Sequence, residues 1–189
     1  IVYTMLNDFQ NAKACYENLK KTMSEEEAKN SLARYALVEV VNLHSDALEF
    51  EPIHRVVFGV EPAKMIEEFE KYYDVSRTPG EGQKVEYFYE GKNETLYIKN
   101  PKSNLAVGSL QMFIDAYIKE HGGKVDYIHG DDVTKELGSK PGNIGFLLPP
   151  MAKTELFKTV ILDGALPRKT FSMGHSYDKR YYLEARKIK

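Results

Sequence analysis

The chain has 189 residues, and its 26 Lys and Arg nearly balance its 28 Asp and Glu, which leaves a formal net charge of -2. This length suits one hydrophobic core, so we expect residues 1–189 to form a single domain. A chain with so little net charge has no global basic field for phosphate backbones, so no nucleic-acid partner is expected. No apolar run approaches the roughly 20 residues that span a bilayer, so no membrane partner is expected either.

The single cysteine and the first residues indicate the setting of the protein. Cys15 alone cannot form an internal disulfide, which fits a reducing compartment, so we expect a cytoplasmic protein. The first residues, Ile1 to Met5, resemble the middle of a strand rather than a natural start. We therefore interpret the chain as a fragment of a longer protein.

The beginning of the chain predicts two helices. Apolar side chains recur with the period of an amphipathic helix over residues 11–23. Ser24 and Glu27 then have the spacing of a capping box, in which each side chain accepts a hydrogen bond from the other residue's backbone N–H. A second short helix is therefore expected from this box to about residue 33.

Two apolar, β-branched runs follow, residues 35–42 and 53–58, and each is typical of a strand buried on both faces. We expect them to pair as a central hairpin. Its strand ends would hold four polar side chains that are candidates for chemistry: His44, Asp46, His54 and Arg55. These histidines lack the close spacing of metal ligands, so neither a metal site nor a cofactor is predicted.

The middle of the chain predicts a helix and a second hairpin. Pro62 suits the first turn of a helix that continues to about residue 73. After a Pro-Gly breaker at residues 78–82, residues 84–90 and 94–99 alternate around a short glycine-containing connection, which is typical of a β-hairpin. Cross-strand packing explains the tyrosines here better than a base-stacking platform, which needs interleaved arginines and lysines.

The C-terminal half predicts three helices and three short strands. A long helix capped by Ser103 or Asn104 should end at Gly122-Gly123, and Asp131-Asp132 suits the positive end of the next helix. The strands are expected over residues 124–128, 144–148 and 180–188. The helix predicted over residues 153–162 should turn four apolar side chains inward: Leu156, Phe157, Val160 and Ile161. The whole pattern predicts an α+β fold, with a mixed, mostly antiparallel sheet of about six or seven strands and helices packed on it.

The polar loop from Leu166 to Gly174 is the candidate ligand site. Arg168 can bind a phosphate or carboxylate with two hydrogen bonds, and Lys169 adds a point charge. Hydroxyl groups and a histidine follow in the same stretch. With the two polar residues of the central hairpin, the candidate ligand-binding residues are His54, Arg55, Arg168, Lys169, Thr170, Ser172 and His175. The alternatives are a solvated loop with a structural Thr-Phe pair, and a His54-Arg55 pair that only holds the hairpin to a carboxylate.

Several stretches of the sequence also carry a family resemblance. In chain order they are Ala12-Lys-Ala-Cys-Tyr-Glu17, Arg34-Tyr-Ala-Leu-Val-Glu39, Leu48-Glu-Phe-Glu-Pro-Ile-His-Arg55 and Leu166-Pro-Arg-Lys-Thr-Phe-Ser-Met-Gly174, with Lys179-Arg-Tyr-Tyr-Leu-Glu-Ala-Arg186. Together they resemble a bacterial family known as domain of unknown function 1015. The resemblance covers nearly the whole chain from Asn11 onward, and it is to roughly the C-terminal half of that family's proteins. It therefore implies that the chain is the C-terminal part of a longer protein, whose N-terminal half would be a partner of this half.

The resemblance implies no established activity. Full-length members carry an Asp-Gly-Asn-His-Ser or Asp-Gly-His-His-Arg motif before the Ala-Lys-Ala helix, and they are similar to ParB-like and free serine kinase proteins, which bind nucleotide phosphates. In this chain Asn7-Asp-Phe-Gln-Asn11 stands at that place, so the motif histidine is absent and Asp8 is at most a remnant. Nucleotide chemistry that needs this motif is therefore not expected of this chain alone.

Three hypotheses on function follow. The first is an accessory domain, not catalytic alone, that binds a small phosphorylated or carboxylated ligand. The second is part of a small-molecule, serine-like kinase or phosphotransferase. The third is a protein-interaction module without a small-molecule site, which would expose a contiguous apolar patch. The sequence does not decide whether the protein is an enzyme.

Overall fold

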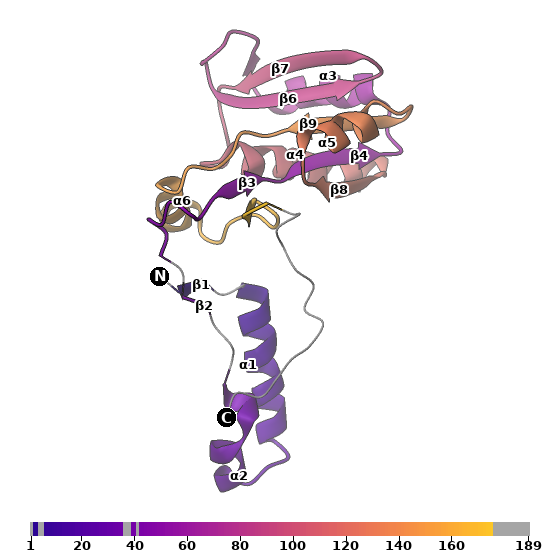
Figure 1. Cartoon of the computed structure of the whole chain (residues 1–189). Helices are drawn as coiled ribbons and strands as arrows, with labels where there is room; N and C mark the ends of the chain where they lie inside the picture. The colour runs from indigo at the N-terminus through magenta and orange to yellow at the C-terminus, as the bar shows by residue number, and fades with distance from the viewer. Residues whose placement is uncertain (1, 4–5, 36–38, 41, 176–189) are drawn as a thin grey trace. The chain divides into compact units, whose positions relative to one another are not determined.

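The computed structural model describes residues 2–3, 6–35, 39–40 and 42–175 (Figure 1). Contacts divide the chain into two compact units, residues 1–46 and residues 47–189. The expectation of a single domain stays a prediction. The strand predicted over residues 180–188 lies outside the described residues.

The first unit is mainly helical. Its elements are β1 (Val2–Tyr3), α1 (Leu6–Lys20), α2 (Glu25–Asn30), a 3-10 turn η1 (Leu32–Arg34) and β2 (Glu39–Val40), and the two strands pair antiparallel. The predicted capping box is confirmed: Ser24 Oγ accepts from the Glu27 N–H, and the Glu27 carboxylate accepts from the Ser24 N–H at 2.8 Å. The Tyr16 hydroxyl donates to the Ala28 carbonyl at 3.1 Å and so joins the two helices.

The second unit contains a six-stranded sheet in which every pair is antiparallel, in the order β5-β7-β6-β9-β4-β8. The strands of this sheet are β4 (His54–Phe58), β5 (Val75–Ser76), β6 (Gln83–Tyr89), β7 (Lys92–Ile98), β8 (Lys124–Ile128) and β9 (Asn143–Leu147). A separate two-stranded ribbon pairs β3 (Phe50–Pro52) with β10 (Phe171–Met173). The α+β fold and the antiparallel character of the sheet are confirmed, as is the hairpin of β6 and β7.

The predicted hairpin of residues 35–42 with residues 53–58 is wrong. Strand β4 has β8 on one side and β9 on the other, so no edge remains for a third partner. Glu39 and Val40 pair with β1 instead. A continuous apolar run indicates that a strand is buried on both faces, but it carries no information about which strand lies beside it.

Helices cover both faces of the sheet (Figure 1). They are α3 (Pro62–Tyr72), α4 (Ala106–His121) and α5 (Asp131–Gly138). A further helix, α6 (Glu155–Asp163), contacts Ser103 and Asn104, which precede α4. Helix α5 lies on the face to which His54 points, and α4 lies on the face to which Arg55 points, because the two side chains contact Asp131 and Gln111 respectively. Since adjacent residues of a strand point to opposite faces, β4 contacts both helix layers. None of the described helices is both long and apolar enough to cross a membrane.

Helix α6 turns a different face inward from the one predicted, and of the four predicted side chains only Leu156 is partly buried. Its buried side chain is Thr159, which accepts a hydrogen bond from the Asn104 amide at 2.8 Å, while Asp163 accepts from the Ser103 hydroxyl at 2.9 Å. These polar contacts hold the helix by its hydrophilic side. Phe157, Val160 and Ile161 are consequently exposed, by 47%, 42% and 80%. The same contacts explain why Ser103 and Asn104 do not cap α4, whose N-cap is Leu105.

Helix α5 approaches the sheet closely at a glycine pair. A Cβ atom at Gly138 would lie 2.5 Å from the backbone nitrogen of Gly145 and 2.9 Å from the ring of Phe88. Both glycines lie in regular elements, so close approach rather than backbone conformation requires them. This contact seats the helix whose first residue, Asp131, pairs with His54.

We predict that Gly138→Ala destabilises the protein by about 1–3 kcal/mol, because the added methyl group overpacks the helix against the β9 backbone. At a solvent-facing position inside a helix, a Gly→Ala change would instead stabilise the protein by up to about 1 kcal/mol. Urea denaturation measures the effect, with exposed Lys135→Ala in the same helix as the control, for which a change within about 0.5 kcal/mol is expected. A Gly138→Ala protein as stable as the wild type would contradict the close packing.

Candidate functional site

The centre of the candidate site is Arg55, whose side chain is fully buried. In the sheet it stands opposite Tyr127 of β8. Its Nε donates to Gln111 Oε1 of α4 at 3.2 Å, and one terminal nitrogen donates to the carbonyl of Ile53. The other terminal nitrogen donates to the carbonyl of Arg168 at 3.3 Å. The guanidinium therefore uses its donors inside the protein and holds the polar loop against the sheet.

The positive charge of Arg55 has no ion-pair partner among the described residues. Its guanidinium carbon lies 5.0 Å from the centre of the Tyr127 ring, in a cation–π arrangement. Burial lowers the pKa of Arg55 to about 10, and the neighbouring charge of Arg168 acts in the same direction. The residue still carries its charge at neutral pH, so the structure keeps a buried cation under the loop.

Arg168 lies on the solvent side of this buried cation. Its guanidinium carbon is 5.7 Å from the centre of the same Tyr127 ring, so both arginines contact one aromatic side chain. The Arg168 side chain is 68% exposed, and its only ion-pair partner in the described part of the chain is Asp115, at 3.9 Å. Lys169 is next in the chain and is exposed, with a positive φ of 58°.

The two predicted hydroxyl donors of the loop are buried and bonded within it. Thr170 Oγ1 donates to the carbonyl of Pro167 at 2.5 Å. Ser172 lies in β10, and its hydroxyl donates to the carbonyl of Gly174 at 3.4 Å. These hydroxyl groups therefore shape the loop, and its accessible polar atoms come from Arg168 and Lys169.

The two arginines and the side chains that contact them form a group that we call the arginine cluster: Arg55, Arg168, Tyr127, Gln111 and Asp115. His54 does not join it, because its side chain points to the other face of the sheet. Its Nδ1 accepts a hydrogen bond from the Leu148 N–H at 3.2 Å, so Nε2 carries the hydrogen and donates to Asp131 Oδ1 at 2.9 Å. Only 2% of the residue is exposed. Burial lowers the pKa of His54, and the carboxylate of Asp131 offsets this only in part. The histidine joins β4, the end of β9 and the start of α5.

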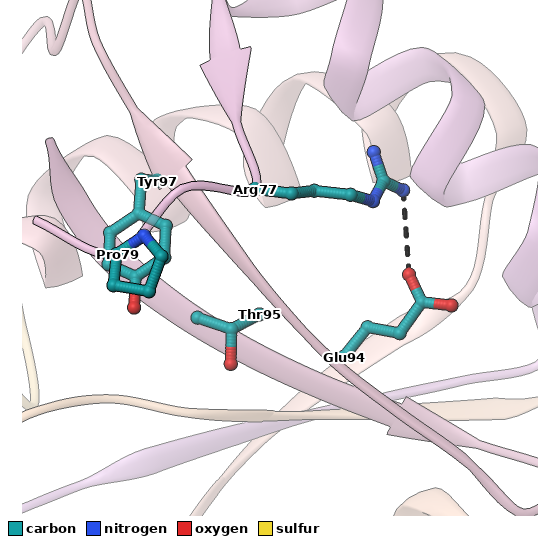
Figure 2. Close-up of a pocket in the computed structure, with 5 residues that line it drawn as sticks. All are labelled: Arg77, Pro79, Glu94, Thr95 and Tyr97. Atoms are coloured by element: carbon teal, nitrogen blue, oxygen red, sulfur yellow. Dashed lines mark hydrogen bonds and ion pairs between the residues drawn. The ribbon is translucent and has the colours of Figure 1, made fainter. Parts of the chain in front are cut away.

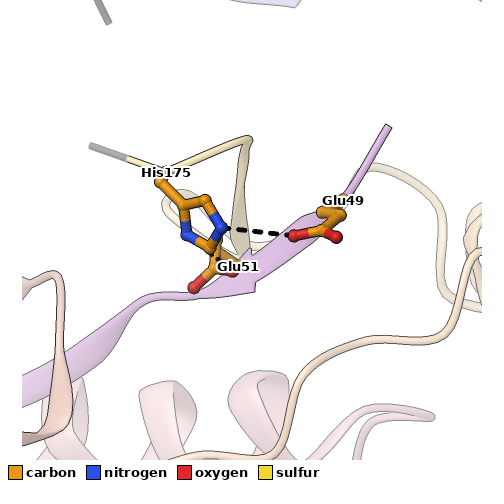
Figure 3. Close-up of side chains that lie close together, drawn as sticks. All are labelled: Glu49, Glu51 and His175. Carbon is orange, nitrogen blue, oxygen red and sulfur yellow. Dashed lines mark ion pairs between the residues drawn. The ribbon is translucent and has the colours of Figure 1, made fainter. Parts of the chain in front are cut away.

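His175 lies at a third place, at the end of the ribbon of β3 and β10. Figure 3 shows its ring between the carboxylates of Glu49 and Glu51. The two ring nitrogens lie 3.3 Å and 3.1 Å from oxygens of these residues. The predicted candidates thus separate into a cluster at Arg55 and Arg168, a buried pair at His54 and an exposed cluster at His175.

An open pocket lies near the other edge of the sheet, far along the strand order from β4. Figure 2 shows its lining residues, which are Arg77, Pro79, Glu94, Thr95 and Tyr97. The positive charge in this pocket is already paired, because Arg77 lies 2.9 Å from a Glu70 oxygen and 3.4 Å from a Glu94 oxygen. A hydrogen bond from Tyr87 lowers the pKa of Glu94, which keeps this carboxylate ionised beside the arginine. The pocket is therefore a poorer anion site than the loop at Arg168.

Comparison with known proteins assigns a family. The model of the family described as "Protein of unknown function (DUF1015)" matches residues 9–117, more than half of the chain. The chain belongs to this family. The comparisons with curated proteins and with solved structures found no significant match.

Membership of the DUF1015 family confirms the resemblance seen in the sequence. The matched segment contains His54 and Arg55 and ends before the loop of Leu166 to Gly174, so the family character of that loop stays a prediction. The likeness to ParB-like and free serine kinase proteins also stays a prediction. The family description assigns no function, which agrees with an uncharacterised protein.

Three residues of the arginine cluster were not among the predicted candidates: Gln111, Asp115 and Tyr127. Gln111 and Asp115 are one helical turn apart on α4, and the Gln111 amide donates to Asp115 at 2.9 Å. The four-residue spacing of Gln111 and Asp115 is the only feature of the sequence that could have indicated that these two side chains meet. The pairing of Tyr127 with Arg55 depends on strand order, which local patterns do not contain.

We predict that His54 makes stability depend on pH. Its folded pKa lies below its unfolded value of about 6.5, so below this pH the unfolded chain binds more protons. Stability is therefore expected to fall as pH falls from about 7 through the folded pKa. Chemical denaturation at several pH values should show a shallower fall in His54→Gln. His121→Gln, which removes an exposed histidine that pairs with Glu68, is the control and should keep the steeper fall. Equal pH dependence in wild type and His54→Gln would refute this role.

We also predict that Arg55→Lys loosens the polar loop. Lysine keeps the charge but lacks the planar fork, so at least one buried acceptor loses its hydrogen bond, at a cost of about 1–3 kcal/mol. Trypsin should then cut faster after Arg168 and Lys169, as measured by mass spectrometry of the fragments. Arg77→Lys, at a side chain that is 58% exposed, is the matched control and should leave the cutting rate unchanged. Identical rates for the two variants would contradict the restraint of the loop by Arg55.

Proposed function

We propose that this protein contributes a binding site for a small phosphorylated or carboxylated ligand and acts as an accessory domain rather than as a catalyst. The site is the loop at Arg168 and Lys169, supported from below by Arg55. The observation that carries the proposal is the pair of guanidinium groups on one tyrosine ring. Among the described residues, a single exposed carboxylate, that of Asp115, lies at ion-pair distance of Arg168.

The charge balance of this cluster supports anion binding. Arg55, Arg168 and Lys169 carry three positive charges against the one negative charge of Asp115. At 3.9 Å the pair of Arg168 with Asp115 is long for a hydrogen-bonded ion pair, and exposed pairs of this kind contribute about 0–1 kcal/mol. A phosphate or carboxylate can therefore compete for the Arg168 guanidinium, which binds such groups through two parallel hydrogen bonds.

The buried hydrogen bonds of the cluster indicate that the loop is held in place before any ligand binds. The carbonyl of Arg168 is fixed by Arg55, and the Thr170 hydroxyl is bonded to Pro167, so the loop backbone is held at both places.

The hydroxyl of Tyr127 is shielded from solvent and has no hydrogen-bond partner among the described residues. A buried polar atom of this kind is one that a ligand or a water molecule would satisfy.

The proposal is tested by thermal unfolding with phosphate, sulfate, nucleotides, serine and phosphoserine at constant ionic strength. A ligand at 100 times its dissociation constant adds about 2.7 kcal/mol to the free energy of unfolding, which raises the melting temperature. We expect at least one of these anions to do so in the wild type and none to do so in Arg168→Ala. Arg77→Ala changes the net charge equally and should keep the response, because Arg77 is already paired with two carboxylates.

Two outcomes would refute the site. One is the absence of a shift with every anion in the wild type. The other is an equal loss of response in Arg168→Ala and Arg77→Ala. That result would mean that the anions raise the melting temperature through the net charge of the protein and not through a site at Arg168. Free serine separates the hypotheses further, because a response to phosphoserine but not to serine places the affinity in the phosphate group.

The other two hypotheses remain predictions. The exposed apolar side chains of α6 are the observation that favours a protein-interaction module, and they lie on the segment directly before the loop. The kinase hypothesis depends on a motif at the position of Asn7 to Asn11, whose side chains are outside the described part of the structure. The absence of that motif from the sequence is why an accessory role is the better proposal.

A further inference from the structure

The cluster at the end of the ribbon of β3 and β10 contains three side chains, two glutamates and a histidine, of types that commonly hold a transition metal. Glu49, Glu51 and His175 each offer one ligand atom, and these atoms all lie within 4.8 Å of one another (Figure 3). The side chains are accessible, with exposed fractions of 61% for Glu49, 34% for Glu51 and 38% for His175. A cation from solvent can therefore reach all three.

The pairing of the two strands explains why these residues meet. Glu49 and Glu51 are two positions apart along an extended segment, so their side chains point to the same side of it. Ser172 stands opposite Glu51, and the Gly174 N–H donates to the Glu49 carbonyl at 2.9 Å. His175 comes directly after this hydrogen bond, which places its ring over the two carboxylates.

We infer that Glu49, Glu51 and His175 form a binding site for a divalent transition-metal ion. This goes beyond the proposed anion site, because the two places share no residue. Ligands about 2.1 Å from a tetrahedral metal lie about 3.4 Å from each other, a spacing that the separation of these atoms fits after small side-chain rotations. A cation also relieves the repulsion between two carboxylates held on one side of a strand.

The donor set defines the class of metal. One imidazole nitrogen with two carboxylate oxygens suits Zn²⁺, Mn²⁺, Co²⁺ or Fe²⁺. Mg²⁺ and Ca²⁺ prefer sites built of oxygen ligands, and Ca²⁺ takes six to eight of them. Three protein ligands leave at least one coordination position for water or for a ligand, as in catalytic rather than structural zinc sites.

Two other histidines of the second unit lie at ion-pair distance of carboxylates without forming such a set. His121 lies 2.8 Å from Glu68 and 4.0 Å from Glu120. His54 is buried, and Asp131 is its only carboxylate partner in the part of the chain that the structure describes. Within the described residues, Glu49, Glu51 and His175 are the one group that brings three potential ligands together. The pair of His121 and Glu68 therefore provides an internal control with the same chemistry and one ligand fewer at short range.

The test is equilibrium dialysis of the tag-free chain against ZnCl₂ and against MnCl₂, followed by elemental analysis. We expect one bound Zn²⁺ per wild-type chain, none in His175→Ala, and one in His121→Ala. Glu49→Gln, at the most exposed of the three positions, should weaken binding by more than the roughly 10- to 100-fold that outer-sphere partners cost. Substitution with Co²⁺ adds a spectroscopic signature, because its visible absorption reports nitrogen and oxygen coordination.

No zinc or manganese bound to the wild type, or equal binding in wild type and His175→Ala, overturns the inference. Circular dichroism and the metal-free melting temperature establish that each variant is folded, and Glu49→Gln replaces His175→Ala if the latter is not. Arg168→Ala should bind the metal as the wild type does. Loss of metal in His175→Ala with an intact anion response, or the reverse in Arg168→Ala, shows that the two proposals stand or fall separately.

Discussion

The structure depends on one interior strand, β4, whose consecutive residues His54 and Arg55 point to opposite faces of the sheet. His54 points to α5 and donates to its first residue, Asp131. Arg55 points to α4 and reaches the polar loop through the Arg168 carbonyl. The alternation of side chains along a strand therefore fixes both layers from a single dipeptide. A shift of register by one residue would exchange a neutral histidine and a charged guanidinium between two packed faces.

The buried charge of Arg55 is costly, and its hydrogen bonds explain why the fold tolerates it. Replacing a buried charge with apolar residues is often neutral or stabilising in proteins, so stability alone does not account for this arginine. Its three nitrogen atoms donate to the carbonyl of Ile53 between β3 and β4, to the Gln111 side chain of α4 and to the loop carbonyl of Arg168. Arg55 thereby determines where the loop lies and adds positive charge beneath Arg168. A residue such as Arg55, which a ligand would not contact, can support an anion site in these two ways: it holds the binding loop in place, and it adds positive charge.

Local patterns in the sequence predicted most elements but not their partners. The capping box at Ser24, the hairpin of β6 and β7 and the start of α5 at Asp131 follow from short-range chemistry, and the structure confirms them. The hairpin of residues 35–42 with β4 failed because periodicity reports burial and not strand order. Helix α6 forms where it was predicted, but its predicted inward face was wrong because polar contacts at Thr159 and Asp163 outweighed an apolar stripe. Strand β10 is too short, at three residues, for alternation to reveal it.

The same limit applies to the candidate sites. The sequence identified cations and histidines, but it could not state that Arg55 and Arg168 share Tyr127 while His54 faces away. The same two segments of the chain contribute residues to the proposed anion site and to the proposed metal site. Residues 49–55 include Glu49, Glu51 and Arg55, and residues 168–175 include Arg168 and His175. The pairing of β3 with β10 joins these segments between the two clusters. One short antiparallel ribbon therefore lies between the two proposed sites, with Arg168 of the proposed anion site at one end and His175 of the proposed metal site at the other.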